Sequence, residues 1–472
     1  MVKKYVHNIY YKKIKNYSGY ESFCYQNCQR IILEYEYGDE AMLFINTALS
    51  INIENEKKME LNERKEFRSL LPSIDKYVHR FYPKNYENAE KIFKKNIKFI
   101  YENEKAIIVG VDTYFLPYTT NYKKRHAKHT LILCGFDLTR NVVYIIDWYT
   151  SWFYKGEIDI KDFLQARNSK NEKDGTFYSG NPIENNWAYI SKITNYSFDK
   201  LFRETIELSR KYYFNEGDRG IIAALQFLKK YISMVDNEEV YEPLFYYMYT
   251  LTNRRKMFMQ YIEYYFILNK LHKNLEFIKQ LKNSITDWDI IVILLLKQSK
   301  RYSIKTRNKL SENIDKVITE ELMIIQNSKV LVWKEIFMKS KVRMVGKKEK
   351  NNKNKYTIDE NKNASENVYT LPISERESVI MGTENNKWDI NDAKFGKEII
   401  NLIIKTGEVS CNVGKDTILE EVDLDSITFI TIIVELEKKY KIEFDDEKML
   451  VSNYKTIGDL IEYVKMKVAK LN

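Results

Sequence analysis

The chain has 472 residues, more than one hydrophobic core usually supports, so we expect two to four domains. Hydrophobic residues make up 44% of the chain and aromatic residues 14%, which is enough apolar surface for globular cores. The formal net charge of +10 comes from lysine spread along a chain that is also rich in Asn, Ile and Tyr. Because no arginine-rich stripe or nucleic-acid-binding motif accompanies it, we do not expect nucleic acid as a partner.

The cysteines and the apolar runs argue against several further classes. Cysteines occur at positions 24, 28, 134 and 411, which fits neither a disulfide framework nor a zinc site, and the five histidines form no cluster. We therefore expect no metal. No apolar segment follows the basic start of the chain, and the longest apolar run, 290–296, is far too short to span a membrane. A soluble cytoplasmic protein with reduced thiols is expected.

Residues 1–195 have the mixed character of an α+β domain. A helix is predicted to begin at Cys24, with Cys28, Ile31 and Tyr35 on the same stripe. A second apolar helix is predicted over 41–49. The β-branched run that starts at Ala106 predicts a strand ending near Pro117.

Two further apolar segments, 129–136 and 142–148, predict an antiparallel hairpin, because the connection between them is short. If the turn centres near Thr139, His129 and Asp147 lie diagonally on neighbouring strands and on the same face. A slip of one residue would place them on opposite faces.

These residues suggest nucleophilic catalysis. A thiol at a helix N-terminus is favoured as thiolate, a histidine can take its proton, and a carboxylate can orient that histidine. Cys24, His129 and Asp147 follow the order cysteine, histidine, acid along the chain. The alternatives are ordinary ones: a buried cysteine, a surface histidine and a turn-forming aspartate. His126 competes with His129 as the base, and Cys28 is expected to be a small buried residue.

The N-terminal region also resembles the N-terminal domain of the butirosin biosynthesis protein H family. The matching segments, in the order of that family, are 23–35 around Cys24, 40–44, 109–118, 129–137, 146–147 and 163–167. The resemblance implies a papain-like fold allied to the bacteriocin-processing cysteine peptidases. It also implies an acyltransferase that moves an acyl group from a carrier-protein thioester to an amine through an acyl-cysteine.

Two positions depart from this resemblance. The family usually has a histidine directly before its cysteine, where this chain has Phe23. Papain-like enzymes have a glutamine about six residues before the nucleophile, and position 18 here is a serine. The resemblance therefore supplies no side chain for the oxyanion hole, and the backbone N–H of Cys24 is one expected donor.

Two regions connect this part to the C-terminus. Residues 196–345 read as almost entirely helical, with a helix predicted over 198–213 and another from Ile221. Aromatic faces in this region, such as that of Tyr241, are expected to be core packing, with substrate binding as the alternative. Residues 346–390 are polar and aperiodic, which is typical of a flexible tether.

Residues 391–472 show the helix order of a small bundle. Its central helix is predicted to begin at Ser426, because apolar residues recur with helical spacing at Phe429, Ile433, Leu436 and Tyr440. Ser426 could be no more than a helix cap. However, Asp425-Ser426-Ile427 and its flanking helices resemble an acyl or peptidyl carrier protein, which is a four-helix bundle. The resemblance implies 4′-phosphopantetheine attached to Ser426, with Asp425 beside it.

Together these observations predict a multidomain α+β protein with a papain-like domain, an all-α middle region, a flexible linker and a carrier bundle. The predicted function is acyl transfer in a thiotemplated secondary-metabolite pathway, from the phosphopantetheine thioester through acyl-Cys24 to an amine. The expected partners are a phosphopantetheinyl transferase, an acyl-loading adenylation enzyme or ligase, and an amine acceptor. The alternatives are a thioesterase or cysteine peptidase-like hydrolase, or a non-catalytic carrier scaffold.

Overall fold

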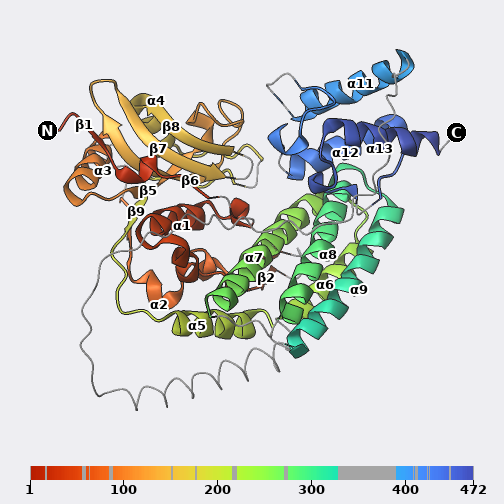
Figure 1. The fold of residues 1–472 in the computed structure, drawn as a ribbon, viewed down its shortest axis with the longest axis horizontal. Coiled ribbons are helices and arrows are strands. Elements are labelled where there is room, and N and C mark those ends of the chain that lie inside the picture. The colour runs from red at the N-terminus through yellow and green to blue at the C-terminus, as the bar shows by residue number, and fades with distance from the viewer. Residues whose placement is uncertain are drawn as a thin grey trace, which may run out of the picture.

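A computed structural model gives the fold (Figure 1). It describes residues 2–15, 17, 19–55, 60–62, 64–83, 89–149, 152–175, 178–214, 220–269, 275–327, 390–407, 409, 413–422, 424, 426–445 and 448–470. Among these residues, an antiparallel sheet and its helices are followed by a helical region and then by a smaller group of helices. The expected combination of an α+β region with all-helical regions is confirmed at this level.

The N-terminal region is built around one antiparallel sheet with the strand order β4-β9-β5-β6-β7-β8 and with β1 paired to the end of β6. The strands are β1 (Lys4–Val6), β4 (Val78–Phe81), β5 (Ile107–Asp112), β6 (Lys128–Asp137), β7 (Val142–Tyr149), β8 (Trp152–Asp159) and β9 (Trp187–Ile190). A separate short pair is formed by β2 (Asn52–Asn55) and β3 (Glu60–Asn62). The predicted hairpin is therefore confirmed as β6 and β7.

Helices cover both faces of this sheet (Figure 1). Helix α1 (Cys24–Tyr37) packs on one face, where it shares a core with Ile108 and Ile132. Helices α3 (Ala89–Asn103) and α4 (Ile160–Arg167) pack on the other face, against Val109 and Leu131. Successive residues of β5 thus enter different cores, which explains why the strand is an unbroken apolar run.

Two predicted elements differ from the structure. The segment 41–49 is not a helix: a 3-10 helix, Gly38–Phe44, is followed by extended chain. The backbone groups after Phe44 bond to distant partners, because the Asn46 N–H donates to Ser69 O and the Leu49 N–H to the Ser209 hydroxyl. The strand predicted to reach Pro117 ends at Asp112, whose carboxylate caps the following turn by accepting from Tyr114 N.

The helical region contains long, tightly packed helices: α5 (Phe198–Tyr212), α6 (Ile221–Met234), α7 (Tyr241–Leu268), α8 (Leu275–Lys300) and α9 (Ile304–Asn327). A four-residue helix, α2 (Pro72–Asp75), lies earlier in the chain. The helices predicted at 198–213 and from Ile221 are confirmed as α5 and α6. Tyr241 is fully buried in the core of the region, which favours packing over substrate binding for that face.

The C-terminal region contains α11 (Ile390–Gly407), α12 (Ser426–Tyr440) and α13 (Ile457–Ala469), with 3-10 turns at Leu419–Val422 and Val451–Asn453. The described residues thus show three α-helices, and the four-helix bundle stays a prediction. The residues from 328 to 389, which include almost all of the predicted tether, lie outside the described residues. Among described residues, no helix has both the length and the apolar character needed to cross a membrane.

Candidate active site and carrier site

The candidate nucleophile is the first residue of α1. Cys24 follows a 3-10 turn, Tyr20–Ser22, and the residue before it, Phe23, caps the helix with its backbone carbonyl, which accepts from Asn27 N at 2.8 Å. Cys24 is partly exposed, whereas the next turn of α1 is buried between the sheet and the helical region. The unpaired N–H groups of a first helical turn favour a negative charge, so this position favours a thiolate.

The thiol of Cys24 is hydrogen-bonded to His129. Burial raises the pKa of the Cys24 thiol, but the hydrogen bond and charge of His129, with hydrogen bonds from Thr130, lower it below its usual value overall. Cys28 differs although it lies only one turn later: burial raises its pKa far above the usual value. The two cysteines of α1 therefore differ in the direction of their pKa shift, and the role of Cys24 as a nucleophile stays a prediction.

Asp147 holds the imidazole of His129 from the other side. His129 Nε2 lies 2.7 Å from Asp147 Oδ1, and both side chains are almost fully buried. Because Nε2 is engaged with the carboxylate, Nδ1 is the ring nitrogen that can serve the thiol. Burial lowers the pKa of His129, but the charge and hydrogen bond of Asp147 and the contact with Cys24 raise it to about 10. Both shifts favour a thiolate and imidazolium pair at neutral pH.

A fourth residue, Tyr118, completes this chain of contacts, and sequence reasoning missed it. The Tyr118 hydroxyl donates to Asp147 Oδ2 at 2.6 Å, and its ring stacks on Tyr154 at 3.9 Å between centroids. Both carboxylate oxygens of Asp147 are thus bonded, one to His129 and one to Tyr118. Tyr118 belongs to the loop between β5 and β6, where its sequence context gives no signal of this contact.

A β-bulge places His129 and Asp147 on the same face of the sheet. Near the turn, Asp137 pairs with Val142 and Phe136 with Val143, and beyond the bulge, Leu133 pairs with Ile145 and Ile132 with Ile146. The pairing shifts by one residue between Leu133 and Gly135. If the register of the turn continued, Asp147 would face Ile132 and point to the other face of the sheet. The predicted diagonal arrangement of His129 and Asp147 is therefore correct, and the bulge produces it.

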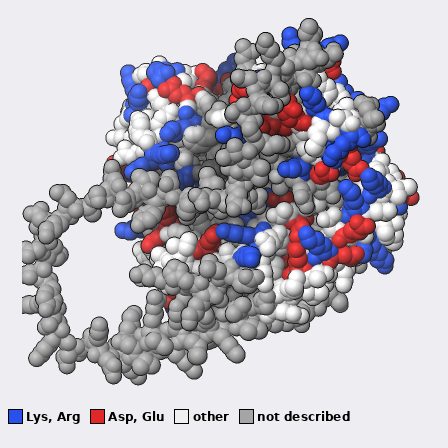
Figure 2. Space-filling view, turned by 45° about the vertical axis from the view of Figure 1, so that its right-hand side comes forward, with Lys and Arg blue, Asp and Glu red and all other residues white. Residues whose placement is uncertain are grey.

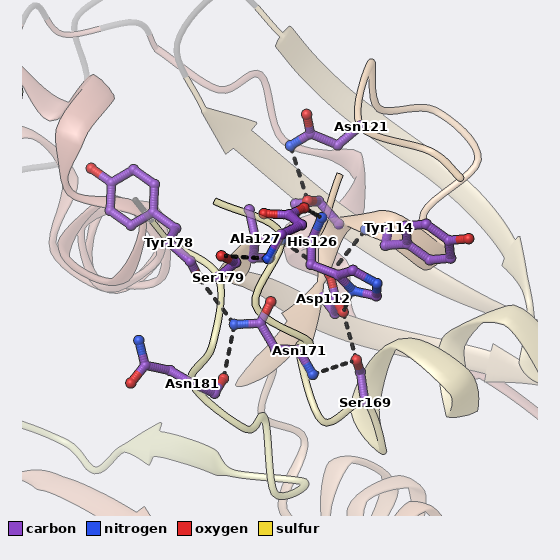
Figure 3. Close-up of polar contacts among 12 residues, drawn as sticks. Asp112, Tyr114, Asn121, His126, Ala127, Ser169, Asn171, Tyr178, Ser179 and Asn181 are labelled. Atoms are coloured by element: carbon purple, nitrogen blue, oxygen red, sulfur yellow. Dashed lines mark hydrogen bonds and ion pairs between the residues drawn. The ribbon is translucent and has the colours of Figure 1, made fainter. Parts of the chain in front are cut away.

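His126, which competed with His129 as the base, lies in a different cluster (Figure 3). Its Nδ1 is 2.7 Å from Asp112 Oδ2, and its ring stacks on Tyr114. The same carboxylate accepts from the Ser169 hydroxyl and from the backbone N–H of Ala127. Asp112 therefore forms hydrogen bonds to both ends of the loop between β5 and β6, which carries Tyr118. His126 has a structural role in the same contacts.

The helical region reaches the turn that precedes Cys24. The Arg254 guanidinium, from α7, lies 4.2 Å from the ring centroid of Phe23 and donates to Gln26 Oε1 at 3.0 Å. The neighbouring Asn253 donates to the Ser22 hydroxyl at 2.6 Å. The aromatic ring of Phe23, one of the two departures from the family pattern, is thus the surface on which a buried arginine of α7 stacks.

Gln26 is the buried glutamine nearest to Cys24 in the sequence, and its side chain is hydrogen-bonded to the backbone of distant segments. Its amide nitrogen contacts the carbonyl oxygens of Asn46, Phe67 and Ser69 at 2.7 to 3.1 Å. It therefore cannot replace the glutamine of papain-like enzymes as an oxyanion donor. Ser18, at the position where that glutamine is expected, lies outside the described residues. The described residues also contain no group of three or more His, Cys, Asp or Glu side chains that could hold a metal ion.

The C-terminal region places its candidate serine at a helix start. Helix α12 begins at Ser426 as predicted, and Phe429, Ile433 and Leu436 are buried in its core. The first turn of α12 contains no acidic residue, and the start of a helix favours a negative charge. Asp425 lies outside the described residues. The helices and this serine define a phosphopantetheine carrier domain.

Comparisons with known proteins agree with this class. Residues 397–464 match the family model for a phosphopantetheine attachment site. The chain is 38% identical to an acyl carrier protein homolog of Mycoplasma genitalium over 71 residues, which are 14% of this chain and 82% of that protein. It is 40% identical to the acyl carrier protein of Renibacterium salmoninarum over 45 residues, 10% of this chain and 53% of that protein. It is 39% identical to the acyl carrier protein of Tropheryma whipplei over 46 residues, which are 10% of this chain and 54% of that protein.

Through this region the chain belongs to the acyl carrier protein family. Its cofactor is covalent 4′-phosphopantetheine. A carrier domain implies partner enzymes that modify it and load it, such as a phosphopantetheinyl transferase. The matched residues lie in the C-terminal region.

Proposed function

We propose that the chain is a cysteine-dependent acyltransferase with a fused carrier domain, in which Ser426 carries the phosphopantetheine. The observation that carries the proposal is the contact chain Cys24, His129, Asp147, on the same polypeptide as a carrier domain. A nucleophile, a base and a group that orients the base are the parts that acyl transfer through a covalent intermediate requires. The position of Cys24 at the start of a helix packed on an antiparallel sheet supports the papain-like resemblance.

The chemistry assigned to each residue balances in two steps. Cys24 thiolate attacks the carbonyl carbon of a thioester, the bond to the departing sulfur breaks, and the His129 imidazolium gives its proton to that sulfur. An amine then attacks acyl-Cys24, His129 accepts a proton from the amine, and the Cys24 thiolate leaves as the amide forms. When bound, phosphopantetheine supplies the activated thioester and a flexible arm. The backbone N–H of Cys24 is a donor for the oxyanion in both steps.

An acyltransferase, a hydrolase and a non-catalytic carrier scaffold are all compatible with this geometry, and one experiment distinguishes them. The full-length protein is coexpressed with a broad phosphopantetheinyl transferase, loaded with an acyl group by an adenylation enzyme or ligase, and mixed with candidate amines. Intact mass follows the acyl group on the wild-type protein and on Cys24→Ala. Ser426→Ala should prevent both the modification and the loading.

An amide product that depends on Cys24, with an acyl-Cys24 species trapped by mass spectrometry, supports the transferase. Release of free acid that depends on Cys24, with every amine tested, identifies a thioesterase or peptidase-like hydrolase instead. Equal rates for the wild-type protein and Cys24→Ala would show that the N-terminal region is a non-catalytic scaffold. A mass gain that survives Ser426→Ala would reject the assignment of Ser426.

A further inference from the structure

The carrier domain is in contact with the helical region in this structure (Figure 1). Helices α8 and α12 pack directly on each other. Leu295 of α8 and Leu436 of α12 belong to one continuous cluster of buried apolar residues. The two regions are far apart in the sequence, so this shared cluster is a tertiary interface and not a consequence of chain connection.

A buried ion pair lies within this interface. Lys297 Nζ, in the last turn of α8, is 2.8 Å from Glu437 Oε1 of α12, and each side chain is only 9% exposed. The same Glu437 oxygen accepts from the backbone N–H of Phe444 at 2.7 Å, so the carrier domain itself fixes the position of this carboxylate. Lys297 at the C-terminal end of α8 also suits the negative end of that helix dipole.

A second, more exposed group of charges surrounds the pair. Glu443 of the carrier domain contacts Lys305 and Lys309 of α9, the latter at 3.4 Å. Burial raises the pKa of the Glu443 carboxyl, but these lysines lower it below its usual value overall. Lysine, arginine and acidic side chains are interspersed over this side of the molecule (Figure 2). Exposed charges alone would therefore let the carrier domain bind at several places on this side with similar strength.

The buried pair supplies specificity that exposed pairs do not. A buried pair of opposite charges contributes little net stability, because removing both from water offsets their attraction. A carrier lacking an acid at this position would leave a buried lysine unpaired, which is strongly unfavourable. We infer that the ends of α8 and α9 form a docking surface for the carrier domain of this same chain, with the Lys297 and Glu437 pair as its specificity contact.

This docking surface contacts the C-terminal end of α12 and the residues that directly follow it. The contacts fall at Glu437 and Glu443, whereas position 426 lies eleven residues before Glu437, or about 16 Å along the helix axis. The ion pairs therefore involve the last turn of α12 and the chain just after it, and not the end of the helix at Ser426. A covalent connection raises the effective concentration of the carrier domain to the order of millimolar, so a weak interface suffices to keep it docked. This inference does not depend on the chemistry of Cys24.

The test uses the full-length, phosphopantetheine-modified protein. Lys297→Glu places two carboxylates together in the buried part of the interface, and Glu443→Lys brings three cations together in the exposed part. The matched control is Lys282→Glu, because Lys282 also lies on α8 but forms an exposed pair with Glu263. Small-angle scattering measures compaction, and hydrogen exchange measures protection of the backbone amides of residues 434–444. Modification of Ser426 by the transferase shows that the carrier domain of each variant is folded.

We expect Lys297→Glu and Glu443→Lys to increase the radius of gyration and to reduce amide protection at 434–444 at least tenfold, while Lys282→Glu matches the wild type. Adding Lys305→Glu and Lys309→Glu to Glu443→Lys restores opposite charges and should restore compaction. Variants that remain as compact and as protected as wild type would overturn the inference. So would a wild-type protein that is already extended, or a reversed charge set that fails to recover compaction.

Discussion

At the scale of single residues, the central feature is the pairing of a thiol whose pKa is lowered with an imidazole whose pKa is raised to about 10. Alkylation by iodoacetamide reports the thiolate. The Cys24 rate should stay high between the lowered thiol pKa and about pH 10, and should fall only as the pH drops through that thiol pKa. His129→Ala should slow the reaction at pH 7 at least tenfold, because the thiol pKa rises when the imidazolium is removed.

Peptide mass spectrometry assigns the alkylation to Cys24 and separates it from the buried Cys28 and Cys134. Cys28 serves as the internal control, because its raised pKa predicts little reaction at pH 7. The predicted pairing is wrong if the Cys24 rate climbs steeply through pH 9 in both the wild-type protein and His129→Ala, as it would for an ordinary thiol.

Asp147→Asn tests whether Asp147 orients His129 as proposed. The amide keeps the shape of the side chain but loses the charge that raises the pKa of His129. We expect kcat for acyl transfer to fall by about 10²- to 10⁴-fold, a range typical for a disrupted acid–base group. The pKa of His129, followed by NMR, should fall as well. An unchanged histidine titration would contradict the role assigned to Asp147.

Tyr118→Phe changes the surroundings of the Asp147 carboxylate less than Asp147→Asn does. It removes one of the two hydrogen bonds to Asp147 and leaves the bond to His129. The free energy of unfolding should fall by about 1–3 kcal/mol, the usual cost when a buried charged acceptor loses a donor. Chemical denaturation measures this loss. A stability equal to that of wild type would show that the Tyr118 hydrogen bond contributes nothing to the site.

At the scale of elements, the bulge in β6 places His129 and Asp147 on one face of the sheet, and Gly135 beside the bulge permits the close pairing of β1. A Cβ atom on Gly135 would lie 2.5 Å from Tyr5 O and 2.9 Å from Val6 Cα, because Gly135 pairs with Val6 of β1. Gly135→Ala should therefore lower the free energy of unfolding by about 1–3 kcal/mol and slow alkylation of Cys24. Gly110→Ala on the neighbouring strand is the control, since a Cβ there has its nearest contact at 3.6 Å. Equal melting temperatures for the two variants would contradict this role of Gly135.

Helix α7 contacts the turn before Cys24, so Arg254 is expected to position Cys24 without touching substrate. Arg254→Met should shift the pH profile of Cys24 alkylation and lower kcat at least tenfold with little change in KM. Arg254→Lys should recover only part of this loss, because a lysine has neither the planar stacking surface nor the forked donors. Lys282→Met on α8 is the control. If the pH profile of Cys24 alkylation in Arg254→Met is identical to that of wild type, Arg254 does not position Cys24 and only packs against Phe23.

Sequence patterns predicted the elements whose partners are local or repetitive, and failed where distant groups decide. The helix at Cys24, the hairpin and the helix at Ser426 were predictable from periodicity and turn residues. The same patterns indicated a helix over 41–49, but Ser69 and Ser209 bond the backbone there and hold it extended. The contacts of Asp147 with Tyr118 and of Phe23 with Arg254 could not be predicted from sequence patterns either, because each joins segments that are distant in the sequence.

At the scale of the whole molecule, the question is whether the carrier domain serves the cysteine on its own chain. If it does, the covalent connection presents the thioester at an effective concentration on the order of millimolar, far above a micromolar protein concentration. Transfer by the wild-type protein should then be first order and independent of dilution. Mixing Cys24→Ala, which has an intact carrier domain, with Ser426→Ala, which has an intact Cys24, allows transfer only between chains.

That mixture should be at least tenfold slower than the wild type at micromolar concentration, and its rate should rise in proportion to concentration. A mixture as fast as the wild type would mean that each carrier domain serves other molecules, and the Lys297 and Glu437 contact would then hold the carrier domain between deliveries. Single-turnover transfer, followed by intact mass over a hundredfold dilution, distinguishes these outcomes. The wild-type protein alone provides the reference, because its rate is independent of dilution only if the donor and the acceptor of the acyl group share one chain.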